Sequence, residues 1–321
     1  MRNDKYSVLT LSLIEPIHNL LPTDPSERVV FIPQAELFSV AFPALQDASG
    51  NYLIQDHTIL TAPSIQVLAL THQLQQGQAE SDLQALIVGN PTMSSLPSAF
   101  RQSQPLADLP GAQQEAIAIA QQFQTQPLLG DAATETTVVQ QMQKARFIHL
   151  ATHGLLEYGN PQTSGVRDVP GAIALAPSAQ NDGLLTSSEI LTMRLNADLV
   201  VLSACDTARG DVTGDGVIGL SRALVSAGAA SVIVSLWKVP DQPTAALMNE
   251  FYRQLQQQPD KAQALRQAML NTMQRYPEPF DWAAFTLIGQ AQQSRQLSIT
   301  DPLLTIDIGT KKSHRNAEQA D

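Results

Sequence analysis

The sequence predicts an α/β fold: a mostly parallel β-sheet with helices on both faces. From residue 85 onward, short apolar runs alternate with amphipathic stretches of about 10 to 15 residues, which is the pattern of strands joined by crossover helices. The run at 198–204 is almost continuously apolar, as expected for a strand covered on both faces. Apolar residues make up 43% of the 321 residues, which is enough to fill a sizeable core.

The elements of this core follow one another in a regular order. Apolar runs bounded by turn residues predict strands at 86–89, 127–130, 145–152, 172–176, 198–204, 231–237 and 282–289. Amphipathic stretches predict helices at 114–123, 131–144, 217–227, 244–256 and 261–275. A further helix is expected to start at Thr186, because Thr186 and Glu189 form a capping box.

The two ends of the chain differ from this core. Residues 1–78 have strand-like runs at 29–33, 37–45 and 52–63 and a helical pattern at 64–75, so we expect a β-rich N-terminal subdomain packed on the main sheet. The polar residues 76–78 then lead into the core, 79–290. Residues 291–321 are polar, and we expect them to form a disordered tail.

Charge and cysteine content narrow the class of protein. The 30 acidic and 19 basic residues give a net charge of −11, which repels nucleic acids and anionic membrane surfaces. No segment approaches the roughly 20 apolar residues of a membrane-spanning helix. The single cysteine cannot form an internal disulfide, so we expect a cytoplasmic protein with a reduced thiol, and we expect neither nucleic acid nor membrane as a partner.

A glycine motif raises the possibility of a bound dinucleotide. Gly214, Gly216 and Gly219 form G-x-G-x-x-G, and Asp241 lies about 20 residues further on, as a ribose-binding acid would. The phosphate-binding turn must follow its strand directly, however, and here the gap after 198–204 is too long. A flexible loop entering a helix explains the glycines, so no cofactor is expected.

A histidine pair raises the possibility of a metal site. His149 and His153 form H-x-x-x-H, but they lie on an expected strand, where four residues span about 13 Å, and cannot both reach one ion. His149 lies between Ile148 and Leu150, so it is interpreted as a core histidine with satisfied hydrogen bonds. No metal is expected.

The remaining candidates for chemistry are His153 and Cys205, each at the carboxyl end of an apolar strand. Reacting groups of open α/β sheets collect at this edge, and a nearby imidazole or helix N-terminus lowers the pKa of a thiol toward neutrality. Gly154 follows His153 directly, so its N–H and that of Cys205 could stabilise an oxyanion. A buried, inert cysteine beside small residues is the alternative explanation.

Several motifs in this order resemble the CHAT domain, a caspase-like family related to separase and gingipain. The resemblance extends over about residues 12–290, and its most specific parts are "HLATHG" (149–154) and "LSACDT" (202–207). His153 precedes Cys205 by 52 residues, close to the caspase spacing of about 50. The resemblance implies a cysteine endopeptidase with Cys205 as nucleophile, His153 as general base and acid, and the amides of Gly154 and Cys205 as oxyanion hole.

Departures from the family pattern concern the substrate pocket and the partners. Asp206 stands where glutamate is more familiar, and an acidic pocket favouring Arg or Lys could be formed by Asp182, Asp206, Asp211 and Asp215, although solvated surface charges explain them equally well. Tetratricopeptide repeats, which often accompany this family, are not visible, so we expect either a stand-alone protease-like domain or an excised piece of a longer protein. A tetratricopeptide-repeat regulator or another activating partner is expected as a possible partner. A regulated peptidase acting on proteins or peptides, a catalytically silent scaffold and a nucleotide-binding protein remain the three hypotheses.

Overall fold

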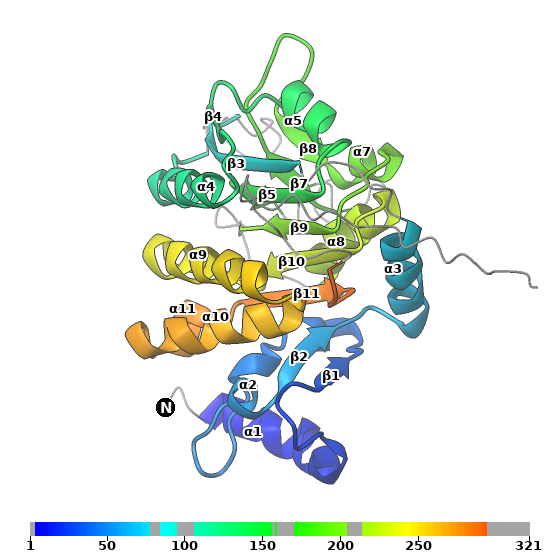
Figure 1. Cartoon of the computed structure of the whole chain (residues 1–321), viewed down its shortest axis with the longest axis vertical. Coiled ribbons are helices and arrows are strands. Elements are labelled where there is room, and N and C mark those ends of the chain that lie inside the picture. The colour runs from blue at the N-terminus through cyan, green and yellow to red at the C-terminus, as the bar shows by residue number, and fades with distance from the viewer. Residues whose placement is uncertain are drawn as a thin grey trace, which may run out of the picture.

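A single large sheet forms the centre of the molecule. The structure is a computed structural model, and it describes residues 4–77, 84–94, 106–155, 158, 170–203 and 214–293. Within these residues, eight strands pair in the order β1-β2-β11-β10-β9-β5-β3-β4 (Figure 1). Their bounds are β1 Arg28–Phe31, β2 Thr58–Thr61, β3 Ala85–Pro91, β4 Leu128–Gly130, β5 Phe147–Ala151, β9 Leu199–Leu202, β10 Ser231–Ser235 and β11 Phe285–Gly289.

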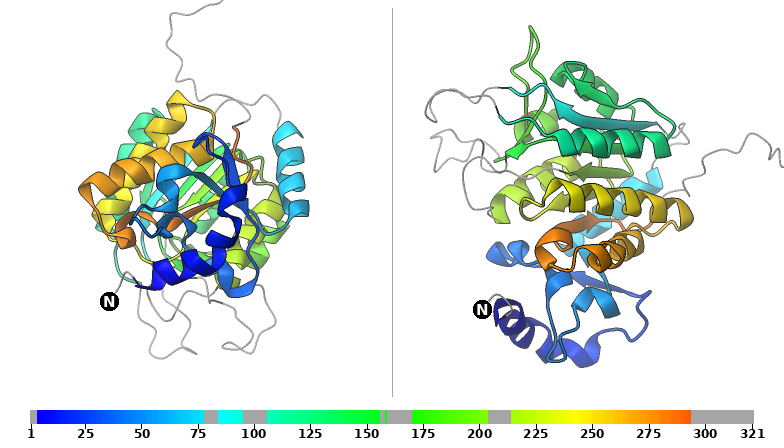
Figure 2. Two further views of the ribbon diagram at one scale, coloured as in Figure 1. Left: turned by 90° about the horizontal axis from the view of Figure 1, so that it is seen from below. Right: turned by 90° about the vertical axis from the view of Figure 1, so that its left-hand side faces the viewer.

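Helices cover both faces of the sheet. The longer helices are α1 (Asp4–Leu13), α3 (Ile65–Gly77), α4 (Pro110–Gln122), α5 (Glu135–Met142), α8 (Gly214–Ala227), α9 (Asp241–Gln257) and α10 (Lys261–Arg275). Helices α4, α9 and α10 lie side by side on one face, whereas α3 and α8 lie on the other (Figures 1 and 2). The predicted α/β class, with a mostly parallel sheet between two helical layers, is therefore confirmed.

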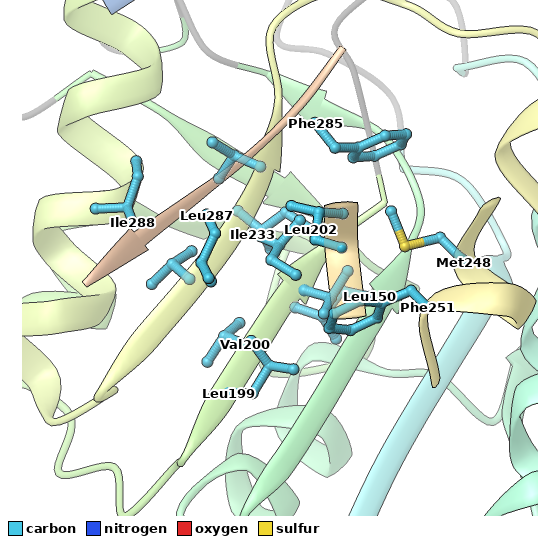
Figure 3. Packing of buried hydrophobic residues seen from close by; sticks show 14 of the residues in the cluster. Leu150, Leu199, Val200, Leu202, Ile233, Met248, Phe251, Phe285, Leu287 and Ile288 are labelled. Atoms are coloured by element: carbon cyan, nitrogen blue, oxygen red, sulfur yellow. The ribbon is translucent and has the colours of Figure 1, made fainter. Parts of the chain in front are cut away.

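The core lies between the central strands and the helices that cover them. Figure 3 shows part of it, with side chains from β5, β9, β10, β11 and α9. Ile233 and Leu287 are partners in the β10–β11 register and therefore point to the same face of the sheet. Burial of such side chains stabilises the fold by about 1.5 to 3 kcal/mol each.

The sheet consists of two groups of parallel strands that run in opposite directions: β1, β2 and β11 form one group, and β10, β9, β5, β3 and β4 form the other. Neighbouring strands pair in parallel, except that β11 is antiparallel to β10. The last apolar run of the core was expected at 282–289, and only Phe285–Gly289 forms the strand, because Pro279–Trp282 is a short helix, α11. The other helices of the core region include α7 (Ser187–Thr192), which begins at the predicted capping box of Thr186 and Glu189.

The N-terminal residues contribute strands to the same sheet. The runs at 29–33 and 52–63 contain β1 and β2, and β2 joins β11 through the pair Thr61 and Ile288. The first part of the second run forms helix α2 (Leu53–Asp56), and residues Glu15–Leu20 form a 3₁₀ helix, η1. The N-terminal segment thus packs on the core by extending its sheet.

The strand expected at 37–45 is wrong. This segment forms two 3₁₀ helices, η2 (Ala35–Ser39) and η3 (Phe42–Ala44). Pro43 has no N–H to give to a strand partner, and local bonds such as Leu45 N–H to the Phe42 carbonyl replace the ladder. The apolar character of the segment serves packing instead, since Phe42 is buried and stacks on Phe31 with ring centroids 4.0 Å apart.

A small second sheet lies next to the end of β5. It has the order β6-β7-β8, with bounds β6 Gly154–Leu155, β7 Ala172–Ala174 and β8 Leu184–Thr186. Of the expected tail, only 291–293 belongs to the described residues. No helix among the residues described above is both long and apolar enough to cross a membrane.

Candidate active site

The three central strands bring their carboxyl ends to one edge of the sheet. Strands β5, β9 and β10 are adjacent and parallel, so the residues that follow them lie at the same edge. Thr152 and His153 follow β5, Ser203 follows β9, and Ser235 ends β10. This edge is the position that the sequence predicted for the reacting groups.

His153 is held firmly at this edge. Its side chain is buried, with 4% of the residue exposed, and its Nε2 lies 2.8 Å from the carbonyl oxygen of Ala107. The backbone around it is fixed by β7, because the Ala174 N–H donates to the His153 carbonyl at 2.9 Å and the Thr152 hydroxyl donates to the Ala174 carbonyl at 2.7 Å. The ring therefore has little freedom to rotate.

The Ala107 contact determines which ring nitrogen of His153 is basic. A carbonyl oxygen can only accept a hydrogen bond, so Nε2 must carry the proton that it donates to Ala107. In the neutral ring, Nδ1 then carries the free lone pair. Nδ1 is thus the atom of His153 that could take a proton from a nucleophile.

The expected nucleophile lies outside the described residues. This is true of Cys205 and of the pocket candidates Asp206 and Asp211. The last described residue after β9 is Ser203, which is buried, and its Oγ has no hydrogen-bond partner among the described residues. The end of β9 therefore places a hydroxyl at the same edge as His153.

A narrow cavity of about 50 Å³ lies beside His153. Its walls come from the ends of β5, β9 and β10 and from helices α4 and α9. Ionisable groups among its lining residues are His153, Glu115, Lys238 and Asp241. Lys238 and Asp241 are exposed, whereas Glu115 is only 2% exposed and so places a carboxylate in the wall of the cavity.

Glu115 is fixed by a polar network in the core. Its Oε1 lies 3.0 Å from Nε2 of His149, and Nδ1 of His149 lies 3.1 Å from the hydroxyl of Tyr252. Burial raises the pKa of Tyr252 well above its ordinary value, so the hydroxyl keeps its proton and can donate it to Nδ1. The interpretation of His149 as a core histidine with satisfied hydrogen bonds is confirmed.

Helices α4 and α9 approach very closely at the cavity. A Cβ added to Gly111 would lie 2.2 Å from Cβ of Asp241, so only glycine fits at this point of α4. Gly89 on β3 permits a similar approach of α4, since its Cβ would lie 2.3 Å from that of Ala116. Because Gly89 and Gly111 have no side chains, α4 can pack closely against both β3 and α9.

The remaining candidates lie in different places. Gly154 begins β6 immediately after His153, so these two neighbours are both at the cavity edge of the sheet. Asp182 lies in the turn between β7 and β8, where its Oδ1 accepts from the Leu184 N–H at 2.9 Å, and it is not among the cavity-lining residues. The buried carboxyl group of Glu135 lies near Asp182. Burial and the negative charge of Glu189 raise the pKa of Glu135.

Two features of the site, the Ala107 carbonyl and Glu115, were not found by sequence reasoning, and Asp241 was considered only as a ribose-binding acid. The Ala107 carbonyl is a backbone group and leaves no side-chain signal. Glu115 lies in the segment "LPGAQQEAIAIA", and Asp241 lies at the end of "SVIVSLWKVPD". An acidic residue within an otherwise apolar segment was the sequence signal that could have identified each as a site residue. Within the described residues, no group of three or more His, Cys, Asp or Glu side chains could hold a metal ion.

Comparison with protein families agrees with the motifs. The sequence model described as "CHAT domain" matches residues 4–290. The chain belongs to the CHAT domain family. This CHAT domain is 28% identical over 312 residues to tetratricopeptide repeat protein 28 of Mus musculus, and 29% identical over 308 residues to that of Homo sapiens. Each match covers 85% of this chain, which spans only 12% of the length of those relatives.

Solved structures similar to this CHAT domain include two of low sequence identity. The Saccharomyces cerevisiae separase–securin complex has a TM-score of 0.48 and 15% identity, covering 82% of this chain and 15% of that one. The Arg-specific cysteine proteinase gingipain R has a TM-score of 0.46 and 11% identity, covering 73% of this chain and 54% of that one.

Proposed function

We propose that this CHAT domain is a cysteine endopeptidase that uses Cys205 and His153. The observation that carries the proposal is the hydrogen bond from His153 Nε2 to the Ala107 carbonyl, which leaves Nδ1 as the base. The strand register supports a partnership with Cys205. Leu150 of β5 is paired with Leu202 of β9, and His153 and Cys205 each follow three residues later.

The reaction follows from these two groups. His153 Nδ1 takes the thiol proton, and the Cys205 sulfur attacks the carbonyl carbon of the scissile peptide bond. The N–H groups of Gly154 and Cys205 stabilise the oxyanion, His153 gives its proton to the leaving amine, and the C–N bond breaks to leave a thioester. Water then loses a proton to His153, attacks the thioester carbon and releases the acid, and the sulfur regains its proton.

Regulation belongs to the same proposal. With His153 only 4% exposed and the cavity beside it about 50 Å³, a peptide cannot reach the imidazole without movement of the surrounding loops. We therefore propose that a partner or signal, such as a tetratricopeptide-repeat protein, opens the site. The proposed setting is cytoplasmic. The acidic residues Asp206, Asp211 and Asp182 are proposed to favour Arg or Lys in the substrate.

The burial of the His153 imidazole also favours a second candidate function. A catalytically silent scaffold would keep this imidazole buried, because its core serves stability and partner binding instead of turnover. Reaction with iodoacetamide separates the two. A peptidase requires Cys205 of the opened site to react at neutral pH faster than an ordinary thiol, because the thiolate is the nucleophile, whereas labelling that stays slow with and without candidate activators supports the scaffold.

The peptidase is tested with a diverse peptide library read by mass spectrometry. Wild-type protein is compared with Cys205→Ala and His153→Ala, with and without candidate activators. Cuts that both substitutions abolish would support the dyad and reveal the preferred residue. Identical products from all three proteins would reject the dyad.

The preference for basic residues is tested separately with Asp182→Asn, Asp206→Asn and Asp211→Asn.

A further inference from the structure

Asn90 has an unusual backbone conformation at the end of β3. Its φ is +44°, in the left-handed region that few side chains other than asparagine adopt without strain. The register between β3 and β4 shifts between Gly89 and Pro91, so Asn90 occupies an irregularity of the strand. Such irregularities commonly redirect a side chain, which suggests a role for the one that is redirected.

The side chain of Asn90 holds the beginning of α4. Its Oδ1 accepts a hydrogen bond from the N–H of Leu109 at 2.8 Å, and its Nδ2 donates to Gln113 Oε1 at 3.4 Å. Leu109 is the residue that precedes α4, and none of its own side-chain atoms caps the helix. Asn90 therefore satisfies one of the N–H groups that a helix start leaves without a partner.

Two residues before Leu109 lies the acceptor of the His153 hydrogen bond. The Ala107 carbonyl is 2.8 Å from His153 Nε2, and the side chains of Ala107 and Asp108 are exposed. Two further contacts hold this segment among the described residues: the Leu106 N–H donates to the Ser94 carbonyl at 3.3 Å, and the side chains of Leu106 and Leu109 pack in a small apolar cluster with Leu155. Asn90 adds the hydrogen bond that fixes the backbone at Leu109. The position of the Ala107 carbonyl thus depends on how Leu109 is anchored.

We propose that Asn90 is a positioning residue for His153, and this rests on the proposed role of His153 as the base. Asn90 anchors Leu109, Leu109 fixes the path of the chain at Ala107, and the Ala107 carbonyl fixes the tautomer and orientation of the imidazole. The body of α4 does not need Asn90, because Gly89 packs against Ala116 and Glu115 binds His149. Loss of the Asn90 side chain is therefore expected to act on His153 more than on the fold.

Two substitutions separate positioning from folding. Asn90→Gly keeps the positive φ and removes the side chain, whereas Asn90→Asp keeps an oxygen that accepts from Leu109, replaces the donor to Gln113 by an acceptor and adds a negative charge. Gln113→Ala is the matched control for that second bond. Thermal unfolding of each variant reports on the fold, and ¹⁵N NMR of the imidazole, assigned with His153→Gln, reports on the tautomer.

In the wild type, His153 is expected as the Nε2–H tautomer, and Asn90→Asp and Gln113→Ala should keep it. Asn90→Gly should mix the two tautomers and, with an active enzyme, lower kcat by about ten- to a hundredfold with little change in KM. An unchanged tautomer in Asn90→Gly would overturn the proposal. If Asn90→Gly does not fold, amide hydrogen exchange of wild-type Leu109 decides, since fast exchange contradicts the anchoring bond.

The NMR measurement needs no turnover, so the two proposals can fail separately. A tautomer change in Asn90→Gly without proteolysis by any variant would support the positioning role and count against the peptidase. Proteolysis that is equal in wild type and Asn90→Gly, with an unchanged imidazole, would support the peptidase and remove Asn90 from its machinery.

Discussion

Lys261 Nζ lies 2.9 Å from Asp198 Oδ1, and neither side chain has any exposed surface. Nζ also donates to the Asp198 backbone carbonyl at 3.1 Å, and a guanidinium nitrogen of Arg146 lies 3.6 Å from Asp198 Oδ2. Burial lowers the pKa of Lys261, while Asp198 acts in the opposite direction. Asp198 and Arg146 precede β9 and β5, so this ionic cluster lies at the edge of the sheet opposite to His153.

Removing the central carboxylate should be strongly destabilising. In Asp198→Asn, Lys261 and Arg146 stay buried and lose the carboxylate that they share, and we expect a loss of about 3 to 5 kcal/mol in the free energy of unfolding. Urea unfolding measures it, with the exposed Glu36→Gln as control. Adding Lys261→Met to Asp198→Asn should recover part of the loss, and equal stabilities of Asp198→Asn and wild type would contradict the role of the cluster.

His57 should make stability depend on pH. Burial lowers the pKa of His57 from 6.5, Asp56 raises it and Arg266 lowers it, and Nδ1 has no hydrogen-bond partner among the described residues. Because the folded-state pKa is below the unfolded one, stability is complete above pH 6.5 and falls as the pH drops toward the folded-state value. The free energy of unfolding of His57→Gln, measured at several pH values, should change less across this window than that of the wild type. The exposed His72→Gln should show the same pH dependence as the wild type.

The hydroxyl of Tyr252 should matter although it lies far from the surface. Tyr252→Phe leaves His149 Nδ1 buried without its partner at 3.1 Å, and we expect a loss of about 1 to 3 kcal/mol in unfolding free energy. Tyr276→Phe, at a partly exposed position, is the matched control. Similar unfolding midpoints for both variants would show that the network around Glu115 does not stabilise the core.

The close approach of α4 and α9 can be tested at Gly111. The Cβ of Gly111→Ala would lie 2.2 Å from Cβ of Asp241 and must push the helices apart at the cavity. We expect a cost of about 1 to 3 kcal/mol, measured by thermal unfolding. Asp241→Gly removes the opposing Cβ, so the double variant should be more stable than Gly111→Ala. Failure of that rescue would locate the clash elsewhere.

The sequence predicted the core of the fold because its signals are local. Continuous apolar runs such as 198–204 identify strands covered on both faces, and the capping box at Thr186 identifies a helix start. The segment 37–45 was mistaken for a strand, since apolar content dominated over the missing N–H of Pro43. The antiparallel direction of β11 depends on which strands pair, and no local pattern contains that information.

The sequence predicted only those parts of the candidate site that stand out by residue type. His153 at a strand end was found, and so was its neighbour Gly154. The Ala107 carbonyl was not, because every residue has one and only the folded chain selects it. Asp182 was chosen for its charge; in the structure it lies near Glu135 and is not among the residues that line the cavity.

The place of β2 beside β11 has a consequence for how the protein is made. During synthesis the residues of β1 and β2 leave the ribosome long before those of β11, which is the only core strand that β2 pairs with among the described residues, through Thr61 and Ile288. Until then Ile59 and Leu60, which are buried in the finished sheet, belong to a strand with an open edge. The nascent N-terminal segment must therefore be shielded from aggregation until the last strand of the sheet emerges.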